Sequence, residues 1–184
     1  MSRIVPRALA IAAIAAAALA CQSPTDPNAT VDLIDATVAP DPATAAGPTG
    51  RFFTIEKTDE PDEVREYDWR ASFSVTVRLT EDANKESVGL DLPLDITSAT
   101  VTVQQASGGI VTPPTGTEKE HYDFVITSST TNRLTGVGAT ATMTFDVWYD
   151  LPNLRREALV NVSVGFADDG TLRFTEVVPV KVAP

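Results

Sequence analysis

Apolar and polar side chains alternate most clearly over residues 67–79. The odd positions are apolar and the even positions are polar, the odd set being Tyr67, Trp69, Ala71, Phe73, Val75, Val77 and Leu79. Successive side chains of a strand point to opposite faces of a sheet, so a period of two predicts a strand with one buried and one exposed face.

A second strand is predicted over 88–96, where Val88, Leu90, Leu92, Leu94 and Ile96 share one side. The polar residues 80–87 suit a hairpin loop between these two strands. At Thr97 and Ser98 the alternation slips by one position, and Ala99, Val101 and Val103 then form the apolar side. A slip of one residue turns a strand over, so we expect a β-bulge or a crossing between sheets there.

Four more segments, 122–126, 139–149, 160–166 and 172–182, show strand-like patterns. In the second of them the expected core residues are Ala139, Ala141, Met143, Phe145, Val147 and Tyr149. Gly108 and Gly109 mark a turn, and Asp169–Gly170 is a strong hairpin signal. Helical periodicity is limited to a short turn at 154–159.

About eight strands separated by turn signals predict an all-β domain over residues 51–184, with the architecture of an antiparallel β-sandwich. The stretch ATVTVQQASGGIVT, residues 99–112, is similar to the strand, glycine turn and strand of bacterial Ig-like modules. That resemblance implies an Ig-like sandwich. The Cys and Trp spacing of antibody domains is absent.

Residues 21–50 have a different composition, rich in Pro, Ala, Thr and Asp, with no aromatic residue and no base. Such a segment buries too little apolar surface to offset the entropy lost on ordering. We expect a disordered stalk here, with a short strand around 31–38 as the alternative.

Residues 1–20 have the pattern of an export signal. Arg3 and Arg7 precede an unbroken apolar run, 8–20, which is too short to cross a bilayer. The segment ALAC that ends in Cys21 resembles a bacterial lipobox. The resemblance implies cleavage before Cys21, a diacylglycerol thioether on its sulfur and an acylated amino terminus. Gln22, rather than Asp, then implies the outer membrane. The alternative is an ordinary secretory signal that leaves a free thiol.

The charge balance argues against one class of partner. The 184 residues include 25 acids and 14 bases, a formal net charge of -11. Nucleic-acid affinity comes from Lys and Arg that displace counterions, so we expect no nucleic-acid partner. With one Cys and one His, the chain cannot form an internal disulfide or a Cys/His zinc cluster.

The titratable residues suggest no catalytic, metal or cofactor site. His121 lies in a charged segment before a strand, as a solvated loop histidine would. The pairs Asp91/Asp95 and Asp146/Asp150 would be about 13 Å apart along a strand, too far for a glycosidase pair. Asp168-Asp169-Gly170 lacks the alternating carboxylates of a calcium loop and is explained as a turn.

Trp148 is the most informative candidate for binding. It falls on the polar side of its strand with Asp146 and Asp150, opposite Val147 and Tyr149. An outward tryptophan could stack on a sugar or fill a partner's pocket. The alternative is that a loop, or the guanidinium of Arg155 or Arg156, covers the ring.

Together these patterns predict a non-catalytic, lipid-anchored envelope protein that presents a β-sandwich for protein contact. Its expected partners are the membrane, through lipid on Cys21, and an envelope protein or a second copy at an unpaired strand edge. A carbohydrate-binding module that uses Trp148 is the alternative. A hydrolase is a third and less supported hypothesis.

Overall fold

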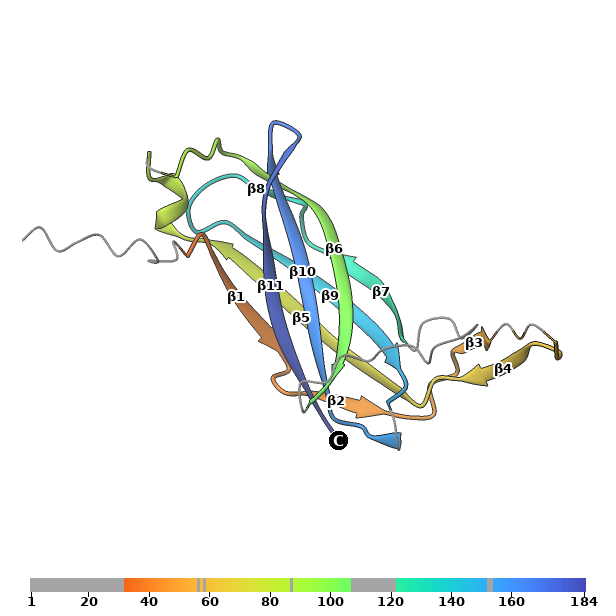
Figure 1. Ribbon diagram of the computed structural model, residues 1–184. Coiled ribbons are helices and arrows are strands. Elements are labelled where there is room, and N and C mark those ends of the chain that lie inside the picture. The colour runs from red at the N-terminus through yellow and green to blue at the C-terminus, as the bar shows by residue number, and fades with distance from the viewer. Residues whose placement is uncertain (1–31, 56, 58, 87, 107–121, 152–153) are drawn as a thin grey trace, which may run out of the picture. The chain divides into compact units, whose positions relative to one another are not determined.

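Eleven strands and one short 3-10 helix make up the regular structure of the residues that the structure describes (Figure 1). It is a computed structural model and describes residues 32–184 except 56, 58, 87, 107–121 and 152–153. The expected signal peptide, Cys21 and His121 lie outside the described residues. The expected all-β fold is confirmed.

The elements lie in the following order along the chain. They are β1 (Ile34–Ala39), β2 (Ala43–Ala46), β3 (Phe52–Ile55), β4 (Glu63–Glu66), β5 (Trp69–Leu79), η1 (Glu81–Asn84), β6 (Leu94–Gln105), β7 (Tyr122–Ser129), β8 (Arg133–Leu134), β9 (Thr140–Tyr149), β10 (Ala158–Asp168) and β11 (Thr171–Ala183).

Nine of these strands form one curled sheet in the order β7-β9-β5-β2-β11-β10-β6-β8, with β1 paired to β5. The short strand β2 joins two halves of this sheet, because it is antiparallel to β5 and parallel to β11. The sheet is therefore mixed, which corrects the expectation of purely antiparallel pairing. The cause is that β2, a continuation of β1 along β5, runs in the same direction as β11.

The two halves enclose a single hydrophobic core. Alternate residues of β5 contribute to it, as the sequence predicts, and Phe73 stacks on Phe145 of β9 with ring centroids 5.7 Å apart. Across from them lie buried valines of β6, β10 and β11: Val101, Val103, Val160, Val162, Val164, Val178, Val180 and Val182. Burial of each such side chain contributes about 1.5–3 kcal/mol.

The strands β3 and β4 form a separate two-stranded sheet that the sequence patterns do not predict. One carboxylate connects β4 to the residues that precede β3: Oε1 of Glu66 accepts hydrogen bonds from the N–H of Thr49 (2.8 Å) and of Gly50 (2.6 Å). The ring of Phe53 packs on Tyr67, with centroids 4.5 Å apart. These contacts fasten the small sheet to the chain on either side of it.

The predicted strand over 88–96 is wrong in its first half. Regular pairing begins only at Leu94, because Pro93 has no N–H for a ladder and Gly89 has a φ of +64°. The predicted hairpin with 67–79 is wrong too. The strand β5 pairs with β1, β2 and β9, whereas β6 pairs with β8 and β10 in the other half of the sheet.

The slip at Thr97 is confirmed as a β-bulge. Ser98 pairs with Gly165 and Ile96 pairs with Phe166, so Thr97 is the extra residue on β6. A Cβ on Gly165 would stand 2.4 Å from the Oγ of Ser98, so a larger residue there would require the Ser98 side chain to move. The bulge restores Val101 and Val103 to the core face.

The Asp169–Gly170 turn is also confirmed, as the tight hairpin between β10 and β11. Both residues have positive φ, 42° and 76°, as a two-residue hairpin of this kind requires. Of the possible helical turn over 154–159, only Leu154 is in a 3-10 conformation, and Ala158 and Leu159 already belong to β10.

The expected boundary at residue 51 needs correction, because the folded unit begins at Asp32. Within the expected stalk, all six residues of β1 pair with β5, and β2 pairs with both β5 and β11. Ile34, Ala43 and Ala45 are buried in the core. Alanine side chains can fill the inward positions of a strand. Such a strand lacks the aromatic and β-branched residues from which strands are predicted in a sequence.

Candidate functional site

Trp148 lies on the outer face of the sheet but is not open to solvent. It stands in a cross-strand row between Asp123 of β7 and Arg70 of β5. The guanidinium carbon of Arg51 lies 4.5 Å from the centre of the indole ring and that of Arg70 lies 5.7 Å away. Only 9% of Trp148 is exposed.

The carboxylates beside Trp148 are held by the protein's own groups. Asp146 accepts hydrogen bonds from the Ser72 hydroxyl and from Nη2 of Arg70, the latter at 2.7 Å. Asp150 Oδ1 accepts one from the Asp68 N–H at 2.6 Å. Each of the two aspartates is buried.

Arg51 completes this cover through an ion pair with Asp123. The expectation of an exposed binding face at Trp148, Asp146 and Asp150 is therefore contradicted. A guanidinium does cover the ring, as the alternative expects, but the alternative is wrong in naming Arg155 or Arg156, since Arg51 and Arg70 cover Trp148 and Arg156 lies 4.3 Å from the ring centre of Trp69. Arg51 and Asp123 are far apart in the sequence, so no local pattern reveals their pairing.

The acidic turn next to β10 also has internal partners. Asp168 is buried, forms an ion pair with Arg173 and accepts a hydrogen bond from the Asp91 N–H at 3.1 Å. The Arg173 guanidinium holds the pKa of this carboxyl below its usual value. Asp95 faces Arg133 at 3.7 Å. Among the described residues, no three metal-ligating side chains gather at one point.

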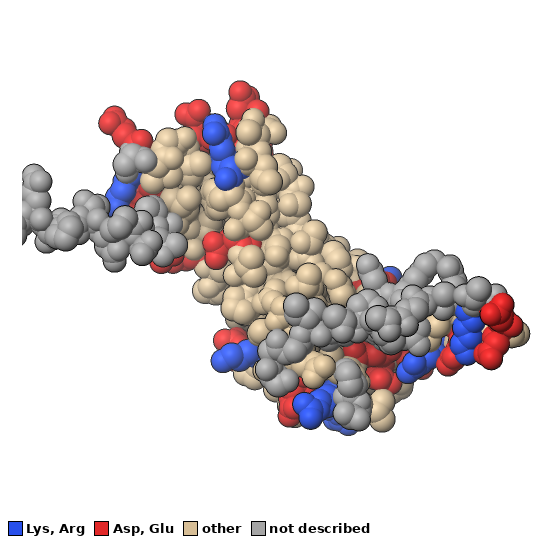
Figure 2. Space-filling model, viewed as in Figure 1, with Lys and Arg blue, Asp and Glu red and all other residues tan. Residues whose placement is uncertain are grey.

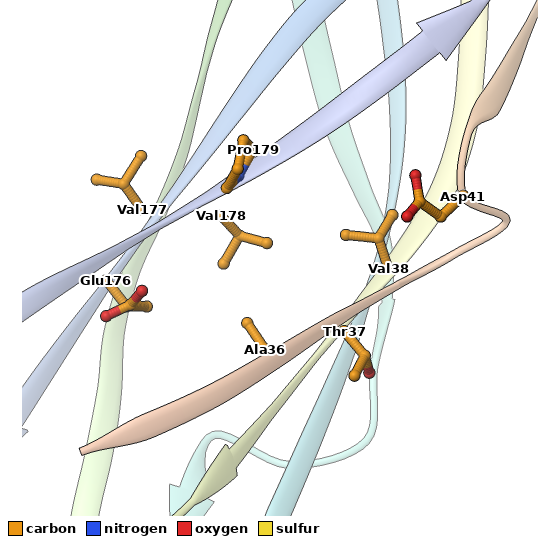
Figure 3. A pocket seen from close by; sticks show the side chains of 8 residues that line it. All are labelled: Ala36, Thr37, Val38, Asp41, Glu176, Val177, Val178 and Pro179. Carbon is orange, nitrogen blue, oxygen red and sulfur yellow. The ribbon is translucent and has the colours of Figure 1, made fainter. Parts of the chain in front are cut away.

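An open feature is the groove between β1 and β11, in which Figure 3 shows the side chains that line it. Its volume is about 540 Å³, and its lining residues are Ala36, Thr37, Val38, Asp41, Glu176, Val177, Val178 and Pro179. Ala36 and Val38 point from β1 toward the gap, and Val178 points into it from β11. The sequence patterns do not predict this groove, because they indicate the strand around 31–38 only as an alternative to a stalk and do not place it opposite β11.

Glu176 is the unusual member of the groove. It follows the core-facing alternation of β11, in which Val178, Val180 and Val182 are buried. Burial and the nearby charge of Asp32 raise the pKa of its carboxyl. No cation among the described residues forms an ion pair with it, and the other charged residue that lines the groove, Asp41, is also an acid.

The surface next to the groove is short of charge. Figure 2 shows charged side chains toward the ends of the molecule in this view, whereas the middle, over β11, β10 and β6, is largely uncharged. Exposed side chains of β11 in this region include Thr175, Val177 and Pro179, and 51% of Val177 is exposed. A neutral surface with an exposed valine suits contact with a protein better than contact with a polyanion.

The described part of the chain contains no helix with the length and apolarity needed to span a bilayer.

Comparisons with known proteins leave the family open. Neither a protein-family model nor a curated protein matches the sequence. A solved structure with a partial likeness is the secreted serine protease VesC from Vibrio cholerae, at a TM-score of 0.38 and 11% sequence identity. The match spans 61% of this chain and 19% of the protease chain, and likeness at this level says nothing about the activity of this protein.

Proposed function

We propose that the chain is an exported, lipid-anchored envelope protein whose Ig-like β-sandwich binds another protein through a strand edge. The supporting observation is the groove in which β1 and β11 face each other without pairing. A strand edge with free backbone groups accepts the strand of a partner. The proposal assigns no catalytic role to any residue.

The Ig-like part of the proposal is supported by the order of the strands. One half of the sheet has the order β7-β9-β5 with β1 at the edge, and the other has β11-β10-β6-β8. The first two strands connect the two halves of the sheet, because β1 pairs with β5 in one half and β2 pairs with β11 in the other. Two half-sheets over one core, with consecutive strands crossing between them, are typical of immunoglobulin sandwiches, and this supports the Ig-like part of the proposal.

The anchoring part of the proposal comes from the lipobox-like ALAC segment. Several acyl chains on Cys21 would hold the protein stably at the bilayer, since each buried methylene contributes about 0.8 kcal/mol. Mass spectrometry of the N-terminal peptide from cell envelopes tests this. We expect an acylated Cys21, and an unmodified thiol there would remove both the anchor and the outer-membrane location.

The contact function is tested by a photo-crosslinking amino acid placed at single positions of the protein in intact cells. At Val177, on the free edge, we expect a discrete crosslinked species. At Val64 on β4, 65% exposed and away from the groove, we expect none. Equal crosslinking at the two positions, or none at Val177, would contradict a protein partner at this edge.

The burial of Trp148 removes the residue on which a carbohydrate-binding function depends.

A further inference from the structure

The backbone of β1 offers hydrogen-bonding groups to the groove. The Thr80 N–H donates to the Leu33 carbonyl at 3.0 Å, which makes Ile34 and Leu79 a pair without direct hydrogen bonds. Such pairs alternate along an antiparallel ladder. Ala36 and Val38 therefore also belong to pairs without direct hydrogen bonds. Their N–H and C=O groups point away from β5.

The facing edge of β11 offers groups of the same kind. Pro179 lies opposite Asn161 of β10. A proline fits a paired strand only where its nitrogen faces away from the neighbour, because it has no N–H to donate. By the same alternation, Thr175 and Val177 direct their backbone groups away from β10. No described residue pairs with this edge between Thr171 and Lys181.

The side chains in the groove define which strand would fit. Ala36, Val38 and Val178 form an apolar surface, and Glu176 adds a carboxylate at a core-facing position. The charged residues that line the groove are both acids, so a second copy of this chain, with its net charge of -11, is a poor occupant. Charge complementarity favours a basic side chain opposite Glu176.

An inward-pointing charge also protects a strand edge from indiscriminate pairing. Protection alone predicts that every added strand is rejected. Recognition predicts that a strand with a Lys or Arg at one position is accepted and others are rejected, so the two roles are experimentally distinct.

We infer that the groove between β1 and β11 receives an extended segment of a partner protein, with apolar side chains against Val38 and Val178 and a Lys or Arg paired with Glu176. This inference rests on the proposed protein-binding function and specifies the chemistry of the partner. The inserted strand hydrogen-bonds to the free groups of Ala36 and Val38 on one side and of Thr175 and Val177 on the other.

The test uses two short synthetic peptides that alternate valine with threonine and differ in one central residue, lysine or glutamate. Binding to the mature protein in detergent is followed by the amide NMR signals of residues 36, 38, 175 and 177. We expect the lysine peptide to shift these signals and to bind at least about tenfold more tightly than the glutamate peptide. Equal binding of both peptides, or binding of neither, would overturn the inference.

Two variants locate the interaction. Glu176→Gln should lower the affinity for the lysine peptide by about tenfold. Glu157→Gln, at an exposed carboxylate outside the groove, should leave that affinity unchanged. Val177→Pro removes one N–H from the free edge, where a proline is tolerated, and should also weaken binding. An unchanged affinity in Glu176→Gln would contradict the proposed pairing.

Other occupants give different results. If a second copy fills the groove, the free protein dimerises in sedimentation and the same amides are protected from hydrogen exchange without peptide. If residues 22–31 fill it, their deletion removes that protection. Either result overturns the inference. Crosslinking at Val177 in cells is independent of these peptides, so a partner without the predicted basic strand would leave the proposed function standing.

Discussion

The outer face around Trp148 and the groove between β1 and β11 differ in how completely their charged side chains are partnered. Around Trp148, Arg51 and Arg70 cover the ring and Asp146 is bonded by Ser72 and Arg70. In the groove, no described cation pairs with Glu176, and no described strand pairs with the facing edges of β1 and β11. The sequence suggests a binding surface at the first region and a flexible stalk at part of the second.

The difference shows that exposure depends on position in the sheet as well as on strand alternation. Trp148 is on the outward side of a central strand, β9, where Arg70 of β5 covers the ring on one side and Asp123 of β7 holds the covering Arg51 on the other. The free backbone N–H and C=O groups of β1 and β11 lie at strand edges. A strand edge is free only where no neighbouring strand pairs with it. Alternation predicts the face of a side chain, whereas the topology determines whether that face is covered.

Truncation of Trp148 should give the largest effect that distinguishes the two regions. Trp148→Ala should lower the free energy of unfolding by roughly 3 kcal/mol, because the ring is enclosed by Arg51 and Arg70. Val177→Ala, at the open edge, should change it by less than about 0.5 kcal/mol. Urea unfolding of the purified protein measures both. Equal losses would mean that the two regions are equally packed.

Fluorescence gives a second view of the same contrast. In a Trp69→Phe background, Trp148 should emit at short wavelength and resist quenching by acrylamide, because 9% of it is exposed. Tryptophan introduced at Val177 in place of Trp148 should emit at longer wavelength and be quenched readily. Emission from Trp148 at the wavelength of an exposed tryptophan would contradict its burial and would support a binding surface at Trp148.

Removal of Asp146 should have the next largest effect. Asp146→Ala leaves Ser72 and Arg70 without their acceptor and should cost about 1–3 kcal/mol. Asp95→Ala is the matched control, since Asp95 is more exposed and lies 3.7 Å from Arg133; its effect should be within about 0.5 kcal/mol. The midpoint of thermal unfolding ranks the two variants.

The ion pair of Arg51 and Asp123 should contribute less. A double-mutant cycle with Arg51→Gln and Asp123→Asn should give a coupling energy of about 0.2–1 kcal/mol, because each side chain is partly exposed. Arg51→Gln should also make Trp148 more accessible to acrylamide, whereas Asp123→Asn should change that accessibility less. Identical quenching in the two variants would show that Arg51 does not shield the ring directly.

Substitution of Glu176 should give the smallest change in the free energy of unfolding, and this change should be an increase. Its pKa is raised by burial and by Asp32, so its stabilising contribution is full below the unfolded-state pKa of about 4.3 and is lost as the pH rises through the folded-state pKa. Glu176→Gln should therefore be slightly more stable than the natural protein at pH 7, and the difference should disappear near pH 4. A constant difference across this range would exclude titration of Glu176 as its cause.

The sequence predicts the central strands well, because their pattern reflects burial on one face. The odd positions of β5, the core positions of β9, the bulge at Thr97 and the turn at Asp169 are all found in the structure. Each of these depends on neighbours along the chain. The strand β1 is harder to predict, because only Ile34 of its six residues is buried and the rest gain order by pairing with β5.

The candidate site is less predictable than the fold. The alternation places Trp148, Asp146 and Asp150 on the outer face correctly, but it does not identify Arg51 and Arg70 as the residues that cover it. The groove depends on β1 and β11 lying at facing edges. The one local signal is Glu176, a carboxylate in an otherwise apolar alternation from Phe174 to Val182.

The double pairing of β2 also has a consequence for the order of folding. Its partners on β11, Val182 and Ala183, are at the far end of the sequence from Ala43 and Thr44. Contacts between distant residues form late, since the intervening chain must first be ordered. A nascent chain that stops before β11 can pair β2 only with β5, so its two half-sheets stay unjoined and the groove does not exist until β11 has been synthesised.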